Sequence, residues 1–146
     1  MRTIKLTRFA DRTLPALLRA TARRSPDATF LRVLDPAARD AAPAEVTFAD
    51  FERAVRRAAA SLSAAGMRAG DRMLMLAENS PAWQEVALGA QALRAEPAAL
   101  FANLSDEPAR AIALRVRPRW PSFPARPSGR SSRRWRASWS PPVSPR

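Results

Sequence analysis

The chain of 146 residues contains no cysteine and no histidine, and its 25 cationic residues include a single lysine, Lys5. These absences exclude disulfides, a thiol nucleophile, a Cys/His zinc site and an imidazole general base. Only carboxylates, hydroxyls, arginines and one lysine remain for chemistry. Arginine, alanine and proline are abundant, and each has codons made only of G and C, so we infer a GC-rich genome.

Long apolar runs are also missing. No segment approaches the roughly 18 consecutive apolar residues of a membrane-spanning helix. Residues 1–11 lack the apolar stretch of a secretory signal, so we expect a cytoplasmic protein. The length allows one domain, but alanine supplies much of the apolar content and bulky core residues are sparse.

Negative charge is absent from the last part of the chain. The net charge is +12, yet the last acidic residue is Glu107, and ten arginines follow between Arg110 and Arg146. The first 109 residues carry 15 cationic and 13 acidic residues, which is close to balance. The positive excess is therefore a property of the C-terminal region and not of the whole protein.

The composition changes near residue 119. From Trp120 to Arg146 the chain is dominated by serine, arginine, proline and tryptophan, with no acidic residue, lysine, leucine, isoleucine or methionine. Such a segment has too few apolar side chains to offset the entropy lost on ordering, so we expect a disordered tail.

Capping residues and apolar spacing predict alternating helices and strands before that point. Thr47 is expected to cap a helix that buries Phe48, Phe51 and Val55 and that ends at Gly66, with Glu52, Arg53, Arg56 and Arg57 facing water. The alternation implies βαβ units and a largely parallel sheet, hence an α/β fold. The expected elements are a helix after Thr13 ending at Ser25-Pro26, strands at Thr29–Leu34 and Glu45–Phe48, the helix after Thr47, a strand at Met73–Ala77, a helix after Ser80, a strand at Ala98–Phe101 and a helix from Ser105 to about Arg117.

Five motifs in this order resemble the beginning of the AMP-forming acyl-CoA synthetases, members of the adenylate-forming superfamily. Glu96 stands where the last of these motifs usually has glycine. The motifs are Thr13-Leu14-Pro15-Ala16-Leu17-Leu18 with Ser25-Pro26-Asp27, Val46-Thr47-Phe48-Ala49-Asp50-Phe51, Gly66-Met67-Arg68-Ala69-Gly70-Asp71-Arg72, Glu78-Asn79-Ser80-Pro81-Ala82-Trp83 and Leu93-Arg94-Ala95-Glu96-Pro97-Ala98-Ala99-Leu100.

The resemblance implies an incomplete N-terminal part of the large adenylate-forming domain over residues 1–119, most like the long-chain fatty-acid–CoA ligases. The intact relative would use ATP, Mg²⁺ and CoA to activate a fatty acid. Its phosphate loop, adenine contacts, Mg²⁺-binding Glu and C-terminal domain would follow later in the chain. A next strand is expected, which Arg115-Val116-Arg117-Pro118-Arg119 approaches before Pro121 and Pro124 interrupt it.

No catalytic, cofactor-binding or metal-binding residue is therefore expected in this chain, and no cofactor or specific partner. A phosphate cradle needs a Gly-rich turn, and the four glycines, Gly66, Gly70, Gly89 and Gly129, are scattered. Four other candidates have ordinary structural explanations: Asp71 and Arg72 as a solvated turn, Asn79 with Ser80 as a helix cap, and Trp83 as a core side chain.

Two origins remain open for residues 120–146. Translation from a shifted reading frame of GC-rich DNA would explain the abrupt change, the interrupted strand and the early end, and we favour it. The alternative is a small nucleic-acid-binding protein that acts through this arm, in which tryptophans are interleaved with Arg126, Arg130, Arg133, Arg134 and Arg136.

Overall fold

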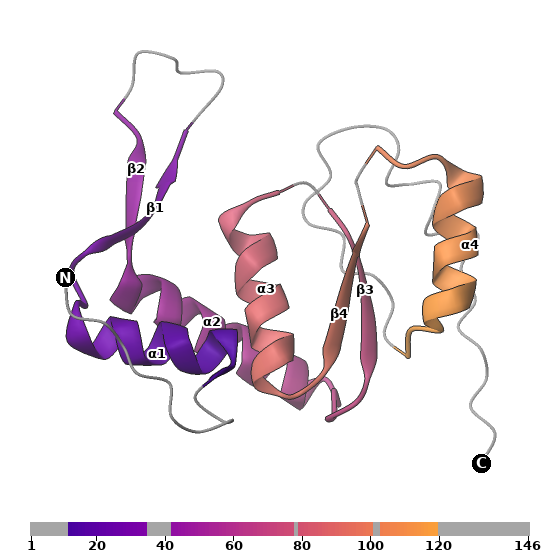
Figure 1. The fold of residues 1–146 in the computed structure, drawn as a ribbon, viewed down its shortest axis with the longest axis horizontal. Coiled ribbons are helices and arrows are strands. Elements are labelled where there is room, and N and C mark those ends of the chain that lie inside the picture. The colour runs from indigo at the N-terminus through magenta and orange to yellow at the C-terminus, as the bar shows by residue number, and fades with distance from the viewer. Residues whose placement is uncertain (1–11, 35–41, 78, 101–102, 120–146) are drawn as a thin grey trace.

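Helices and strands alternate along the chain in a computed structural model that describes residues 12–34, 42–77, 79–100 and 103–119 (Figure 1). The expected tail and its basic arm, from residue 120 onward, lie outside the described residues. The elements are α1 (Leu14–Arg24), β1 (Thr29–Val33), β2 (Ala44–Thr47), α2 (Phe48–Ala64), β3 (Arg72–Leu76), α3 (Pro81–Ala92), β4 (Glu96–Leu100) and α4 (Asp106–Val116).

The first three helices begin at the residues that the sequence predicts. The Thr13 hydroxyl accepts a hydrogen bond from the backbone N–H of Ala16 at 3.3 Å, and the Ser80 hydroxyl accepts one from Trp83 at 3.2 Å. Thr47 accepts from the Asp50 N–H at 3.1 Å and donates its own proton to the Asp50 carboxylate at 2.9 Å. Each cap satisfies a backbone donor that the first helical turn leaves without a partner.

Helix α2 ends through a left-handed glycine, as predicted. Gly66 has φ of +100°, and its N–H donates to the Ser63 carbonyl at 2.9 Å. The Met67 N–H reaches back to the Leu62 carbonyl at 3.0 Å, and both of these side chains are buried in the same core cluster. This Schellman arrangement satisfies the last carbonyls of the helix and directs the chain toward β3.

The four strands form two separate pairs. β1 and β2 are antiparallel, with Leu31 opposite Val46, as expected for a short returning strand. β3 and β4 are parallel, with Arg72 opposite Glu96 and Leu76 opposite Leu100. The parallel part of the sheet is thus confirmed for β3 and β4, which are joined through α3 as a βαβ unit.

Two core clusters hold these pairs against the helices. Phe51 is fully buried beneath the β1–β2 pair, with its ring centroid 4.6 Å from that of Phe30. Under β3 and β4 the core is rich in methionine and alanine, and it includes the fully buried Met73. Helices α2 and α3 cross closely at Gly89, where a Cβ would stand 2.9 Å from the backbone nitrogen of Ala59.

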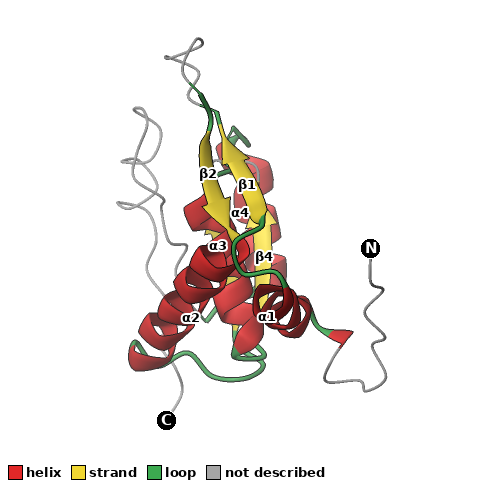
Figure 2. Cartoon of the chain, turned by 90° about the vertical axis from the view of Figure 1, so that its left-hand side faces the viewer, coloured by secondary structure: helices red, strands yellow, loops and turns green. Residues whose placement is uncertain are grey.

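The β3–β4 pair is covered on both faces. Figure 1 shows α3 on one side of the two strands and α4 on the other, and Figure 2, turned by 90°, shows the same order from front to back. Ala109 and Ala113 of α4 are buried, and α4 packs against β3. Cover on both faces explains the short, continuous apolar sequence of β3. None of the described helices is both long and apolar enough to cross a lipid bilayer.

Three expectations about local structure are wrong. The Glu52 side chain is only 14% exposed, because it lies between two arginines instead of facing water. β4 begins at Glu96, two residues early, since the Glu96 N–H already donates to the Asp71 carbonyl at 2.8 Å. The predicted start of α4 is confirmed, since Ser105 is its N-cap residue, although the Ser105 side chain makes no capping bond. Arg115 and Val116 belong to α4 and are not the start of a strand.

Candidate functional site

The turn before β3 contains the one charged side chain that is buried among the described residues. Asp71 is 7% exposed. Its carboxylate accepts the backbone N–H of Arg68 at 2.7 Å and pairs with the Arg119 guanidinium at 3.3 Å. The expectation of a solvated turn is therefore wrong for Asp71, although Arg72 beside it is exposed. The aspartate ties together the turn, the start of the parallel pair and the segment after α4.

Arg119 makes a second contact at the same place. Its backbone N–H donates to the carbonyl of Arg72 at 3.0 Å, on the first residue of β3. The chain reaches this position through Arg117, which adopts a left-handed conformation with φ of +47°, and through the buried Pro118. Sequence reasoning missed the tie between Asp71 and Arg119, because 48 residues separate them and no motif relates them.

The turn between α3 and β4 is built without a glycine. Its left-handed residue is Arg94, with φ of +62°, and the Arg94 carbonyl accepts the N–H of Gly70 at 2.9 Å. Glu96, which stands where the family has glycine, is extended and exposed at the start of β4. A side chain is tolerated at position 96 because the left-handed turn is completed two residues earlier.

The junction between β3 and α3 has the structural role that the sequence predicts. Ser80 caps α3, and Asn79 is exposed beside it. Trp83 is half-buried and packs against the cluster that contains Met73 and Ala87. These contacts account for Ser80 and Trp83 without a ligand.

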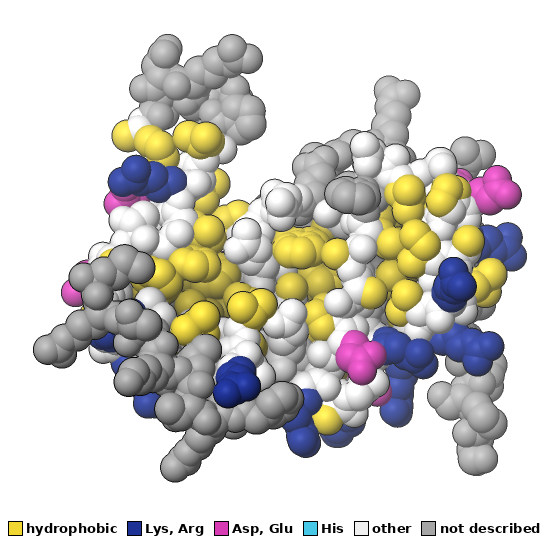
Figure 3. Space-filling model, viewed as in Figure 1, with side chains coloured by type: hydrophobic (Ala, Val, Ile, Leu, Met, Phe, Trp, Pro, Cys, Tyr) yellow, Lys and Arg dark blue, Asp and Glu magenta, His cyan; other side chains and the backbone are white. Residues whose placement is uncertain are grey.

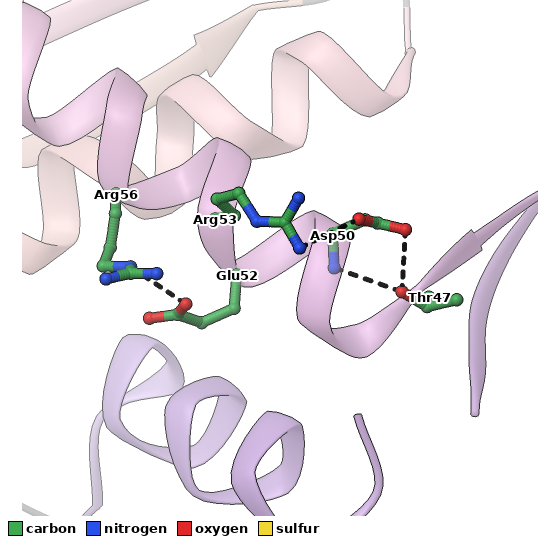
Figure 4. Close-up of polar contacts among 5 residues, drawn as sticks. All are labelled: Thr47, Asp50, Glu52, Arg53 and Arg56. Atoms are coloured by element: carbon green, nitrogen blue, oxygen red, sulfur yellow. Dashed lines mark hydrogen bonds and ion pairs between the residues drawn. The ribbon is translucent and has the colours of Figure 1, made fainter. Parts of the chain in front are cut away.

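A hollow of about 480 Å³ lies between α1 and α2, and Glu52 is among the residues that line it. Glu52 pairs with Arg56 at 3.0 Å and with Arg19 of α1 at 3.9 Å. Figure 4 shows Glu52 and Arg56 beside the cap formed by Thr47 and Asp50, and Arg53 pairs with Asp50 at 3.3 Å. The carboxylates are thus engaged by neighbouring arginines, and the arrangement stabilises the α1–α2 contact.

A second hollow, of about 510 Å³, lies between α4 and the start of β3. It is open and lined by Arg72, Ala111, Leu114, Arg115 and Arg117. Figure 3 shows cationic side chains gathered at this end of the sheet, below α4. Within the described ranges, no group of three or more His, Cys, Asp or Glu side chains could hold a metal ion. The three arginines that line this hollow would attract an anion.

The carboxyl group of Glu45 has a lowered pKa. The Thr29 hydroxyl donates to Glu45 at 2.9 Å and Arg32 donates at 2.8 Å, so the pKa of Glu45 is lowered. Both contacts cross between β1 and β2 on an exposed surface. They stabilise the strand pair and do not mark a reactive group.

The fold matches the N-terminal parts of several solved structures. The N-terminal domain of FACL13 from Mycobacterium tuberculosis aligns with a TM-score of 0.73 at 24% identity, over 90% of this chain and 32% of that one. The fatty acid AMP ligase from Legionella pneumophila aligns with 0.66 at 19% identity, over 80% and 21%. The NpsA N-terminal subdomain from Klebsiella oxytoca aligns with 0.65 at 18% identity, over 74% and 26%.

The chain thus spans no more than about a third of the length of these structures, and it matches the N-terminal part of the adenylate-forming fold. No curated protein sequence matches the chain. A sequence profile described as "AMP-binding enzyme" matches residues 18–119, a range that ends where the composition changes. The chain belongs to the AMP-binding enzyme family.

Proposed function

We propose that residues 1–119 are the N-terminal scaffold of an AMP-forming acyl-CoA synthetase, and that this chain alone does not catalyse the reaction. The observation that carries the proposal is the family match over residues 18–119, together with the fold shared with the N-terminal domain of FACL13. The domain boundary at residue 119 is part of the proposal.

The reaction of the intact relative has two steps. A fatty-acid carboxylate attacks the α-phosphorus of Mg²⁺-bound ATP, which gives an acyl-adenylate and releases pyrophosphate. The thiol of CoA then attacks the acyl carbon and AMP leaves. ATP, Mg²⁺ and CoA are thus the cofactors and co-substrates proposed for the intact enzyme.

The scaffold would support this site without supplying its reactive groups. The triphosphate requires a Gly-rich turn whose backbone N–H groups converge on it. The chain has four glycines, and none is next to another. Gly66 and Gly70 serve left-handed turns, and Gly89 serves the close crossing of α2 and α3. Each described glycine therefore has a structural explanation.

The test is exchange of labelled pyrophosphate into ATP by the purified chain of 146 residues, with Mg²⁺ and fatty acids of short, medium and long chain. We expect no exchange above the rate without protein, while an intact fatty acyl-CoA synthetase in the same buffer gives robust exchange. Exchange that depends on the fatty acid would overturn the proposal.

We also propose that residues 120–146 are translated from a shifted reading frame. The support is the abrupt change of composition at the end of the family match. The test is the DNA downstream of the stop codon, where another frame should encode a Ser/Thr- and Gly-rich loop. Without such a frame the basic arm becomes the better explanation, and it predicts nucleic-acid binding that weakens steeply with salt and is lost without residues 120–146.

A further inference from the structure

The two edges of β3 are not equivalent. In a parallel ladder, alternate residues direct their backbone N–H and C=O groups to one neighbour or to the other. The Asp71 carbonyl accepts the N–H of Glu96, so Asp71, Met73 and Met75 face β4. The Arg72 carbonyl accepts the N–H of Arg119, so Arg72, Leu74 and Leu76 face the opposite edge. We call this opposite side the far edge of β3.

The far edge carries one hydrogen bond within the described part of the chain, from Arg119 to Arg72. The N–H and C=O groups of Leu74 and Leu76 have no strand partner among the described residues. Leu74 is nevertheless only 8% exposed. Backbone polar groups in such surroundings are costly to leave unpaired, and so the far edge favours the addition of a strand.

The topology places the next strand at the same edge. α3 and α4 cover opposite faces of the β3–β4 pair (Figures 1 and 2). Crossovers between parallel strands are right-handed in nearly every protein. A crossover through α4 on the opposite face therefore returns past β4 and places its strand on the far side of β3. Arg119, bonded to Arg72 and paired with Asp71, is the first residue of that path.

The residues that follow Arg119 do not suit this edge. Arg119 N–H donates to Arg72, so a parallel strand would next use the N–H of position 121, donated to Leu74, and then that of position 123. Position 121 is proline, which has no N–H to donate. Position 124 is also proline, but in this register the backbone of position 124 faces away from β3, so no donor is needed there.

We propose that the far edge of β3 binds in trans an apolar, proline-free strand of another polypeptide, parallel to β3 and paired with Leu74 and Leu76. The strand is parallel because a crossover through α4 returns the chain to the start of β3, where Arg119 is bonded to Arg72. It is apolar because α3 and α4 cover the two faces beside it, and strands buried on both faces are rich in aliphatic residues. The proposal rests on the backbone of this chain and is independent of its proposed function.

The test measures the binding of three labelled peptides to the full chain by fluorescence anisotropy. The first, Trp-Val-Ser-Phe-Val-Ala-Arg, corresponds to positions 120–126 with valine in place of both prolines. The second restores only the proline of position 121, and the third only that of position 124. We expect the first and third to bind equally, and the second about fivefold more weakly, as the loss of one net hydrogen bond implies.

A matched pair of chain variants tests the same edge from within. The substitution Pro121→Val gives the chain's own segment the missing N–H donor. This segment should then compete with the first peptide for the far edge and weaken its binding. Pro124→Val should leave the binding of the first peptide unchanged. Equal affinity for all three peptides, no binding, or equal effects of the two substitutions would overturn the proposal. Association of the chain with itself through this edge, seen as concentration-dependent sedimentation that blocks the peptide, would also overturn it.

Discussion

The two strand pairs of this protein are completed in different ways. In the β1–β2 pair, Glu45 links the strands through Thr29 and Arg32, and the rings of Phe30 and Phe48 lie 4.9 Å apart beneath it. The β3–β4 pair depends on a tie between Asp71 and Arg119, 48 residues apart, and it leaves the far edge of β3 open among the described residues. The first pair is stabilised by residues of its own two strands and the helix beside them, whereas the second is tied to a residue far along the chain.

The largest expected effect comes from emptying the core beneath β1 and β2. Phe51 is fully buried, so Phe51→Ala should cost about 3–5 kcal/mol, measured by urea denaturation followed by circular dichroism. Met73→Ala is the matched change in β3, whose fully buried side chain belongs to the other core cluster, with about 2–5 kcal/mol expected. A loss below about 1 kcal/mol for either variant would contradict the assignment of that cluster as a core.

The next largest loss of stability is expected when the buried pair of Asp71 and Arg119 is broken, and it should exceed the loss at an exposed ion pair. Asp71→Asn keeps the size of the side chain but removes the charge that faces Arg119 and the Arg68 N–H. We expect a loss of about 1–3 kcal/mol, as for a buried hydrogen-bonding group left badly paired. Asp50→Asn, at an exposed ion pair with Arg53, is the control and should cost less. Equal losses in thermal or urea unfolding would contradict the buried role of Asp71.

The crossing of α2 and α3 joins the two regions, and it depends on Gly89. A methyl group there would meet the Ala59 backbone nitrogen at 2.9 Å, so Gly89→Ala should destabilise by about 1–3 kcal/mol, less any gain in helix propensity. Gly70→Ala is the comparison: its Cβ meets nothing within 4 Å, but φ of +80° strains alanine. A stabilised Gly89→Ala variant would show that the helices can move apart.

A smaller effect distinguishes two helix caps. Thr47 accepts the Asp50 N–H, and Thr47→Ala should cost about 1 kcal/mol. Ser105 holds the same position in α4 without a side-chain bond, so Ser105→Ala should cost only a few tenths of a kcal/mol. Differential scanning calorimetry of both variants measures the two losses of stability. A larger loss for Ser105→Ala than for Thr47→Ala would contradict the difference between the two caps.

The smallest effect is a pH dependence of the β1–β2 pair. Hydrogen bonds from Thr29 and Arg32 lower the folded-state pKa of Glu45, so its stabilising contribution is complete above the ordinary glutamate pKa of about 4.3. It disappears as the pH falls through the lowered pKa. Glu45→Gln should therefore be slightly less stable than the natural chain at neutral pH and equal to it in strong acid. Parallel curves of stability against pH would contradict this linkage.

Much of the fold was predictable because its signals are local. Thr13, Thr47 and Ser80 cap helices as their spacing indicates, and Gly66 ends α2 with positive φ. The predictions are wrong where the local structure depends on contacts with residues distant in the sequence. Glu52 is drawn against α1 by Arg19, and β4 begins early because Glu96 pairs with the Asp71 carbonyl.

The site was less predictable for the same reason. Ser80 and Trp83 have the structural roles expected of them, while the burial of Asp71 depends on a partner that no sequence pattern connects to it. The left-handed conformation of Arg94 could not be predicted from residue propensities, because arginine does not favour a φ of +62°. Its conformation is set by the need to bring Gly70 and Glu96 together.

Amide hydrogen exchange along β3, measured by nuclear magnetic resonance, tests the difference between its two edges most directly. The N–H groups of Met73 and Met75 face β4, whereas those of Leu74 and Leu76 face the far edge. We expect the Leu74 and Leu76 amides to exchange at least about tenfold faster, because no strand among the described residues pairs with that edge. Equal protection of all four amides would show that the far edge is already paired, and it would contradict an open sheet.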